Sequence, residues 1–137
     1  MNEKGYEIRL RNAEGIPILH LAGDITKSAL KAVKATLEHL ASAGHYNIVL
    51  NIERAHMANV RFLTGLSGAV RNIRSHYGAV DLIVSPDAKQ QMPITGQISR
   101  LFRLCASESQ AISRIKRLTR HPDVVNQANA RIWRNHD

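Results

Sequence analysis

The seven histidines and the single cysteine are the side chains of this sequence best suited to bind a metal or attack a substrate. The histidines are scattered, and none pairs with a second histidine and a carboxylate at the spacing of a helical zinc site. Cys105 is a lone thiol, which excludes an intramolecular disulfide and a Cys/His zinc finger. We therefore expect no metal site, and we interpret Cys105 as a small packing residue.

Sequence motifs that would indicate an enzyme are missing too. The sequence has no G-x-x-x-x-G-K-[ST] phosphate loop and no G-x-G-x-x-G after a strand. The run from Gly65 to Gly68 has the wrong spacing for a G-x-S-x-G nucleophile elbow and falls inside a predicted helix. Among the eleven Asp and Glu residues, no pair stands out for acid–base catalysis. The sequence thus favours a protein that is not an enzyme and uses no cofactor.

Length and charge indicate one basic domain. The 137 residues suffice for a single core without disulfides, and no apolar run approaches the length of a membrane span. The polar start, Met1 to Arg11, does not look like a signal peptide, so we expect a cytoplasmic protein. The net charge is +8, and residues 100–137 contribute eight Lys/Arg against three Asp/Glu. Such a surface attracts nucleic acid, anionic lipid or acidic proteins.

Apolar strands and amphipathic helices alternate along the chain, which predicts an α/β domain. The expected strands are 6–11, 16–21, 46–52 and 79–84. The expected helices are 27–43, 61–77, a helix after Pro93 with the stripe Ile94, Ile98, Leu101 and Phe102, and a helix after Ser107. We assign residues 1–120 to this domain and 121–137 to a basic tail or a docking helix.

Specific residues predict where the helices begin and end. Thr26 is the expected N-cap of the first helix, and Ser107 with Gln110 matches a capping box. Gly44 and Gly78 are expected to end the first and second helices. Two glycines inside the second helix, at positions 65 and 68, each cost about 1 kcal/mol relative to alanine. We expect them to allow close approach to a neighbouring backbone.

Five stretches of the chain follow one known pattern in order. Residues 21–26 (LAGDIT) are similar to an L-x-G-[x]-[IL]-D entry to a helix, and residues 48–52 (IVLNI) to the central strand VVLDL. Residues 57–63 (MANVRFL) align with FIDSSGL, and residues 78–84 (GAVDLIV) with a G-x-x-L-x-LV turn and strand. Residues 109–111 resemble an S-x-x-x-A helix opening. Together these stretches resemble the STAS domain of sulfate transporters and bacterial anti-sigma factor antagonists, over about three-quarters of the chain.

The resemblance implies a STAS-like mixed β-sheet with helices packed on it. It also implies a non-enzymatic, bacterial regulatory module of the anti-sigma factor antagonist kind, acting in signalling and transcription regulation through protein–protein interaction. The fifth strand of the family is not evident here, because Leu104-Cys105-Ala106 is very short.

The phosphorylation site departs most from the family pattern. In anti-sigma factor antagonists a serine in the loop after the central strand is phosphorylated by the partner kinase, and the added charge breaks the complex. The resemblance places that serine at Arg61, preceded by Val60, and neither residue has a hydroxyl. Asn59 stands where aspartate is usual, and Phe62 stands where glycine is usual. The phosphorylation switch is therefore absent at the family position.

The resemblance also implies a partner surface on this loop and the next helix. Thr64 and Ser67 are either substitute phosphorylation sites or, as we expect, ordinary helix residues. Met57 and Phe62 are either apolar anchors or core residues. The expected partner is an anti-sigma factor, a kinase-like or another acidic protein, with a homodimer as a further option, and its binding should not depend on ATP. The surface comprises His56, Met57, Ala58, Asn59, Val60, Arg61, Phe62, Thr64, Ser67, Arg71 and Arg74.

Two other functions stay open. Nucleic-acid binding is the first, because the C-terminal part is basic, although six aromatic residues in the whole chain do not suffice for stacking platforms. A small-ligand sensor is the second, supported by nothing beyond helix N-termini. The residues that favour nucleic acid are Arg114, Lys116, Arg117, Arg120, Arg131, Trp133 and Arg134.

Overall fold

The computed structural model describes residues 5–56, 60–86 and 96–120. Five strands form one sheet in the order β1-β2-β3-β4-β5. The first strand is antiparallel to the second, and the other three pairs are parallel, so the sheet is mixed as expected. The strands are β1 (Tyr6–Ala13), β2 (Ile16–Asp24), β3 (Asn47–His56), β4 (Ala79–Ile83) and β5 (Phe102–Cys105).

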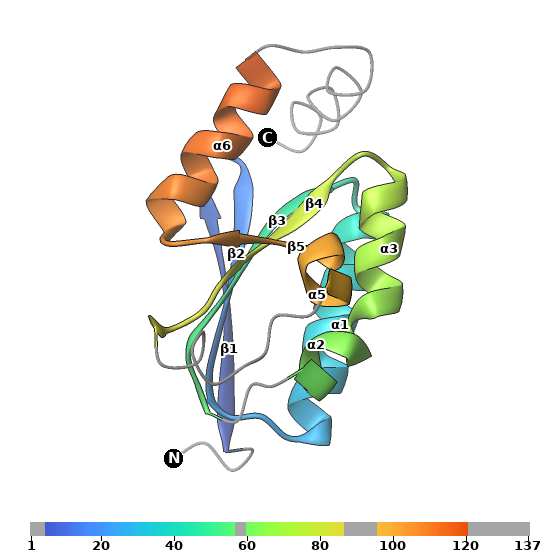
Figure 1. Cartoon of the computed structure of the whole chain (residues 1–137), viewed down its shortest axis with the longest axis vertical. Coiled ribbons are helices and arrows are strands. Elements are labelled where there is room, and N and C mark those ends of the chain that lie inside the picture. The colour runs from blue at the N-terminus through green and yellow to red at the C-terminus, as the bar shows by residue number, and fades with distance from the viewer. Residues whose placement is uncertain (1–4, 57–59, 87–95, 121–137) are drawn as a thin grey trace.

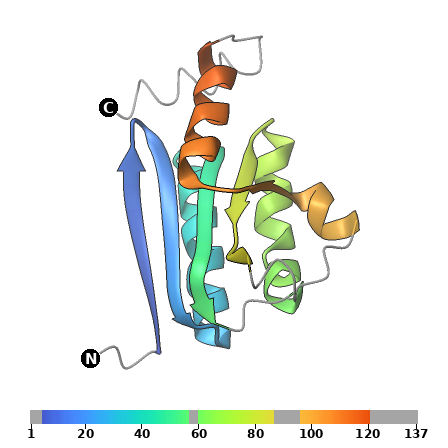
Figure 2. The same cartoon turned by 60° about the vertical axis from the view of Figure 1, so that its left-hand side comes forward.

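Helices cover both faces of the sheet unequally. Figure 1 shows α1, α2, α3 and α5 on one side of the strands and α6 on the other. Figure 2 shows the same arrangement, with α6 in front of the sheet. We call the first group the helical layer. The helices are α1 (Lys27–Ser42), α2 (Val60–Gly65), α3 (Ser67–Ser75), α5 (Gly96–Leu101) and α6 (Glu108–Arg120).

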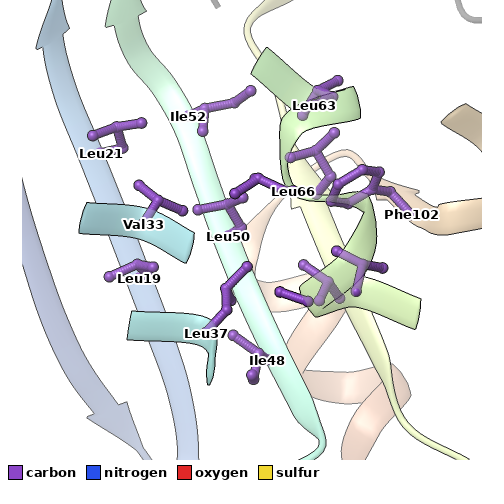
Figure 3. Close-up of a cluster of buried hydrophobic side chains, with 14 of the residues drawn as sticks. Leu19, Leu21, Val33, Leu37, Ile48, Leu50, Ile52, Leu63, Leu66 and Phe102 are labelled. Atoms are coloured by element: carbon purple, nitrogen blue, oxygen red, sulfur yellow. The ribbon is translucent and has the colours of Figure 1, made fainter. Parts of the chain in front are cut away.

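The main core lies between the sheet and the helical layer. Alternate residues of each strand point to this side, because successive side chains of a strand face opposite sides of a sheet. Leu50 at the centre of β3 is completely buried among leucines and isoleucines of β2, α1 and α3 (Figure 3). A smaller cluster lies beneath α6 and includes Val49, Ile83 and Ile115. Full burial of one such side chain contributes roughly 1.5–3 kcal/mol.

Hydrogen bonds confirm the predicted ends of α1 and the start of α6. The Thr26 Oγ1 accepts from the backbone N–H of Ala29 at 3.2 Å. Gly44 follows the helix with a φ of 92°, and the next N–H reaches back to the carbonyl of Leu40 at 2.9 Å. This is the Schellman arrangement that favours glycine. Ser107 Oγ accepts from the N–H of Gln110 at 3.1 Å, as in a capping box.

The helix expected over residues 61–77 is divided into α2 and α3. Leu66 separates them with φ −89° and ψ −3° and has no side-chain cap. An added Cβ at Gly65 would lie 2.8 Å from the Leu30 Cδ2, so this glycine lets α2 approach an α1 side chain. At Gly68 an added Cβ meets nothing within 4 Å. The expected close approach to a backbone is therefore wrong at both positions.

The end of α3 also differs from expectation. The left-handed residue is Tyr77, with a φ of 63°, and the N–H of Gly78 bonds to the carbonyl of Ile73 at 3.2 Å. Gly78 serves another purpose, since an added Cβ there would lie 1.7 Å from the carbonyl oxygen of Tyr46. A glycine is required here because Gly78 lies against the backbone of Tyr46, just before β4 pairs in parallel with β3.

Four of the five strands were underestimated from the sequence, since β1 ends at Ala13 and β2 at Asp24, beyond the predicted residues 11 and 21. β3 continues to His56, beyond the predicted strand 46–52, because Arg54, Ala55 and His56 still pair with the end of β2. The expected absence of a fifth strand is wrong: Phe102 to Cys105 pairs in parallel with β4. Phe102 continues the apolar spacing of α5 and starts the strand without a turn, so a helical period hid it. The predicted tail, residues 121–137, lies outside the described residues.

No helix in the described part of the chain combines the length and the apolar composition needed to cross a lipid bilayer.

Candidate functional site

The predicted partner surface begins where β3 ends. His56 is the last residue of that strand and is exposed. Arg61 lies in the first turn of α2 with its side chain in solvent. Phe62 is only 3% exposed and packs in the main core. Of the two roles considered for Phe62, the core residue is therefore confirmed and the exposed apolar anchor is wrong. Its burial follows from the helical period, which turns it toward the sheet next to Leu63.

The remaining predicted residues of this surface lie along α2 and α3. Thr64, Arg71 and Arg74 are exposed, and Ser67 is half-buried at the first position of α3. Val60 begins α2. The predicted residues Met57, Ala58 and Asn59, together with the side chain of Val60, lie outside the described residues.

The outer surface of the helical layer is strongly basic. In the sequences of α1, α2, α3 and α5, Glu38 is the one acidic residue against seven exposed Lys and Arg residues. The amphipathic periods of these helices place the charges outward, because the apolar stripes face the sheet. We call this surface the basic face. Its cations are Lys27, Lys31, Lys34, Arg61, Arg71, Arg74 and Arg100.

None of the cations of the basic face makes an ion pair within residues 5–56, 60–86 and 96–120. The ion pairs of the described chain involve side chains of β1, the first turn, α6 and the α6 side of the sheet instead. They are Arg9–Glu7, Arg11–Glu108, His20–Glu108, Arg103–Asp81 and Lys116–Glu14. Four described carboxylates, those of Glu7, Glu14, Asp81 and Glu108, are thus paired away from the basic face.

One hollow on the basic face is lined mainly by arginines. Arg71 and Arg74 come from successive turns of α3, Arg100 comes from α5, and Leu101 is largely buried at its wall. The hollow has a volume of about 360 Å³. Sequence reasoning missed Arg100, because it lies 26 residues beyond Arg74 and only the packing of α5 on α3 joins them.

A second hollow lies on the α6 side of the sheet, over β1, β2 and β3. It measures about 920 Å³ and is lined by side chains of both charges. Glu108 in the first turn of α6 lines this hollow, where it pairs with Arg11, accepts from Asn51 Nδ2 at 2.7 Å and lies 3.2 Å from His20 Nε2. Three partners already engage this carboxylate, so we interpret the cluster as an anchor that holds α6 on the sheet.

A buried charge lies beneath α6. Asp81 of β4 is fully buried, and its Oδ1 accepts from the Nε of Arg103 at 2.8 Å. Burial raises the pKa of Asp81, and the neighbouring Arg103 opposes that shift. Burial likewise raises the pKa of the Cys105 thiol, which also faces Asp81. A thiol that resists ionisation is a poor nucleophile, which supports the packing role predicted for it.

Among the described residues, no three His, Cys, Asp or Glu side chains lie close enough together to hold a metal ion.

Comparison with known proteins identifies the fold. No protein-family model matches the chain, and no curated protein sequence matches it significantly. Solved structures do match. An anti-sigma factor antagonist from Mycobacterium paratuberculosis superposes with a TM-score of 0.70 at 12% identity, covering 84% of this chain and 97% of that one.

The anti-sigma factor antagonist SpoIIAA is similar in two states. Its unphosphorylated form gives a TM-score of 0.63 at 18% identity, covering 82% of this chain and 100% of that one. The phosphorylated form of the Bacillus protein gives 0.61 at 20% identity, covering 80% and 99%. The chain therefore has the α/β fold of STAS-domain anti-sigma factor antagonists, with a five-stranded mixed sheet, as the sequence resemblance implied.

Proposed function

We propose that this chain is a non-enzymatic regulatory module that binds an acidic protein partner through its basic face. The observation that carries the proposal is the group of exposed cations on α1, α2, α3 and α5 that have no ion-pair partner within the described residues. Such an arrangement leaves a field of one sign in solvent, which speeds the encounter with a surface of opposite charge. The likeness to anti-sigma factor antagonists supports a protein as the partner, such as an anti-sigma factor.

Arg61 supports a module that binds constitutively. SpoIIAA has been solved both phosphorylated and unphosphorylated, and the sequence resemblance places the modified serine of the family at Arg61. A phosphoserine has a charge of about −1.5 to −2 at neutral pH, whereas a guanidinium stays positive. A permanent positive charge therefore stands where the family switches to a negative one. Phosphorylation of this chain should consequently not release the partner, and ATP added to the complex should not dissociate it.

Nucleic-acid binding by the C-terminal segment is less well supported. Lys116 of α6 pairs with Glu14 at 2.9 Å, and Arg114 acts electrostatically on the buried Asp81. Part of the positive charge of α6 is therefore already engaged within the domain. The expected cytoplasmic location and a homodimer stay predictions.

Affinity capture of the tagged chain from lysate of its source cells tests the proposal. The capture is run at physiological salt with and without nuclease, and with and without magnesium ATP. We expect a stoichiometric protein partner that survives nuclease, is retained in ATP and elutes steeply with salt, because exposed charges are screened over about 8 Å. Loss of all partners on nuclease treatment would assign the basic charge to nucleic acid. Release by ATP would overturn the constitutive mode.

A further inference from the structure

The arginine hollow concentrates like charges that the fold itself does not balance. Arg71 and Arg74 are three residues apart and so are neighbours on one face of α3. Arg100 reaches the same hollow from α5, which packs on α3. Within the described residues none of the three guanidinium groups has an acidic partner. An anion in the hollow would relieve their mutual repulsion.

The chemistry of the hollow selects a phosphate over a carboxylate. Guanidinium groups present planar pairs of donors that bind two oxygens of one anion at once. A carboxylate offers a single negative charge and two oxygens. A phosphate monoester offers three free oxygens and a charge of about −1.5 to −2, which better matches three cations around one space. Recognition of phosphorylated motifs by arginine clusters is a recurring binding mode.

The size of the hollow favours a phosphate attached to a larger molecule. A phosphate has five covalently bonded heavy atoms and therefore fills less than the space of five separate water molecules, which is about 150 Å³. The hollow is about 360 Å³, which leaves room for the side chain that bears the phosphate and for its neighbours. Leu101 gives the wall an apolar part that the carbon atoms of such a side chain could contact.

We propose that this arginine hollow binds a phosphorylated serine or threonine side chain of the protein partner. The inference rests on the proposed function, since it names the feature of the partner that the basic face recognises. The chain then binds a phosphate group on another protein instead of carrying one at position 61.

Titration of the ¹⁵N-labelled full chain with the tripeptide glycyl-phosphoseryl-glycine tests the inference by NMR. We expect saturable shifts of backbone amides in α3 and α5, and none with the unphosphorylated tripeptide. The variant Arg100→Gln should bind the phosphopeptide roughly three- to fivefold more weakly, which is the upper part of the range for one exposed charge pair. Arg9→Gln is the matched control, because Arg9 is exposed on β1 and faces the α6 side. It should bind like the wild type.

Several outcomes would overturn the inference. They are the absence of shifts in α3 and α5, equal binding of the unphosphorylated tripeptide, or no effect of Arg100→Gln in a variant whose other amide signals are unchanged. Inorganic phosphate that binds as tightly as the phosphopeptide would assign the hollow to free phosphate. A partner that is captured equally well from phosphatase-treated lysate would leave the proposed function intact and refute this inference alone.

Discussion

Replacement of Arg103 by methionine should lower the free energy of unfolding by about 2–3 kcal/mol at neutral pH. The guanidinium of Arg103 is the ion-pair partner of Asp81, whose side chain is fully buried, and the Nε to Oδ1 distance is 2.8 Å. Loss of one partner from a buried pair typically costs about 3–5 kcal/mol, because an uncompensated charge stays in the interior. We expect a cost at or below the lower end of this range, since a third of the Arg103 side chain is exposed and water screens the pair.

The pH dependence of this cost has a definite sign. Burial raises the pKa of Asp81 above its ordinary value of 3.8 in spite of Arg103. The folded chain therefore binds the proton of the Asp81 carboxyl more tightly than the unfolded chain does. Protonation of Asp81 stabilises the fold, and this stabilisation is lost as the pH rises through the pKa of Asp81 in the folded chain. Without Arg103 the pKa of Asp81 in the folded chain rises further, so the free energy of unfolding falls by a larger amount as the pH rises. The variant should be closer to the wild type at pH 4.5 than at pH 8.

Urea unfolding at the two pH values measures both effects in a double-mutant cycle. Asp81→Asn is the matched variant, because the asparagine amide has the shape of the carboxylate and leaves no unpaired charge in the interior when Arg103 is replaced. In the D81N background, Arg103→Met should cost below about 1 kcal/mol. A cost that is equal at both pH values, or equal in the two backgrounds, would show that Arg103 does not compensate a buried charge on Asp81.

Three other features of the fold predict the effect of substitutions on stability and the reactivity of a thiol. Gly78→Ala should lower the free energy of unfolding by about 2 kcal/mol or more, because the added Cβ would clash with the Tyr46 carbonyl and force the backbone to move. Gly68→Ala should raise the free energy of unfolding by about 0.5–1 kcal/mol, since an added methyl group meets nothing there. Urea midpoints compare the two, and a similar loss from both would contradict the assigned contacts. Tyr77→Gly should stabilise the chain by about 0.5–1 kcal/mol, because Tyr77 is 71% exposed and adopts the left-handed conformation that glycine prefers; an unchanged or lower melting temperature would argue against this geometry. Cys105 should react slowly with iodoacetamide at pH 8 in the folded chain and rapidly in urea, since the thiol is buried and its pKa is raised; equal rates would mean that the thiol is accessible.

Much of the fold was predictable because the apolar periods of the strands and helices differ. The alternation of strands with helices, the Thr26 cap and the Schellman end at Gly44 are local signals, and the structure confirms them. β5 was missed because Phe102 satisfies a helical period and a strand register at once. The end of β3 was missed because its last residues are exposed and polar, so only their pairing with β2 identifies them as strand.

The candidate site was predictable only in part. The outward cations of α2 and α3 follow from the helical period, since they lie opposite the apolar stripe. The same period cannot tell whether Phe62 is an anchor or a core residue, because that depends on the sheet it meets. Arg100 joins Arg71 and Arg74 through tertiary packing alone. The bond between Asn51 and Glu108 spans 57 residues and has no local signal either.

The most direct test of the account is the affinity of the purified protein partner for two charge-reversed variants, measured by titration calorimetry. One variant combines Arg61→Glu with Arg71→Glu on the basic face. The control combines Arg9→Glu with Arg117→Glu, which are exposed on β1 and α6 and change the net charge equally. We predict binding weaker by about tenfold or more for the first and within about twofold of wild type for the control. Equal weakening by both, or none by the first, would contradict partner binding through the basic face.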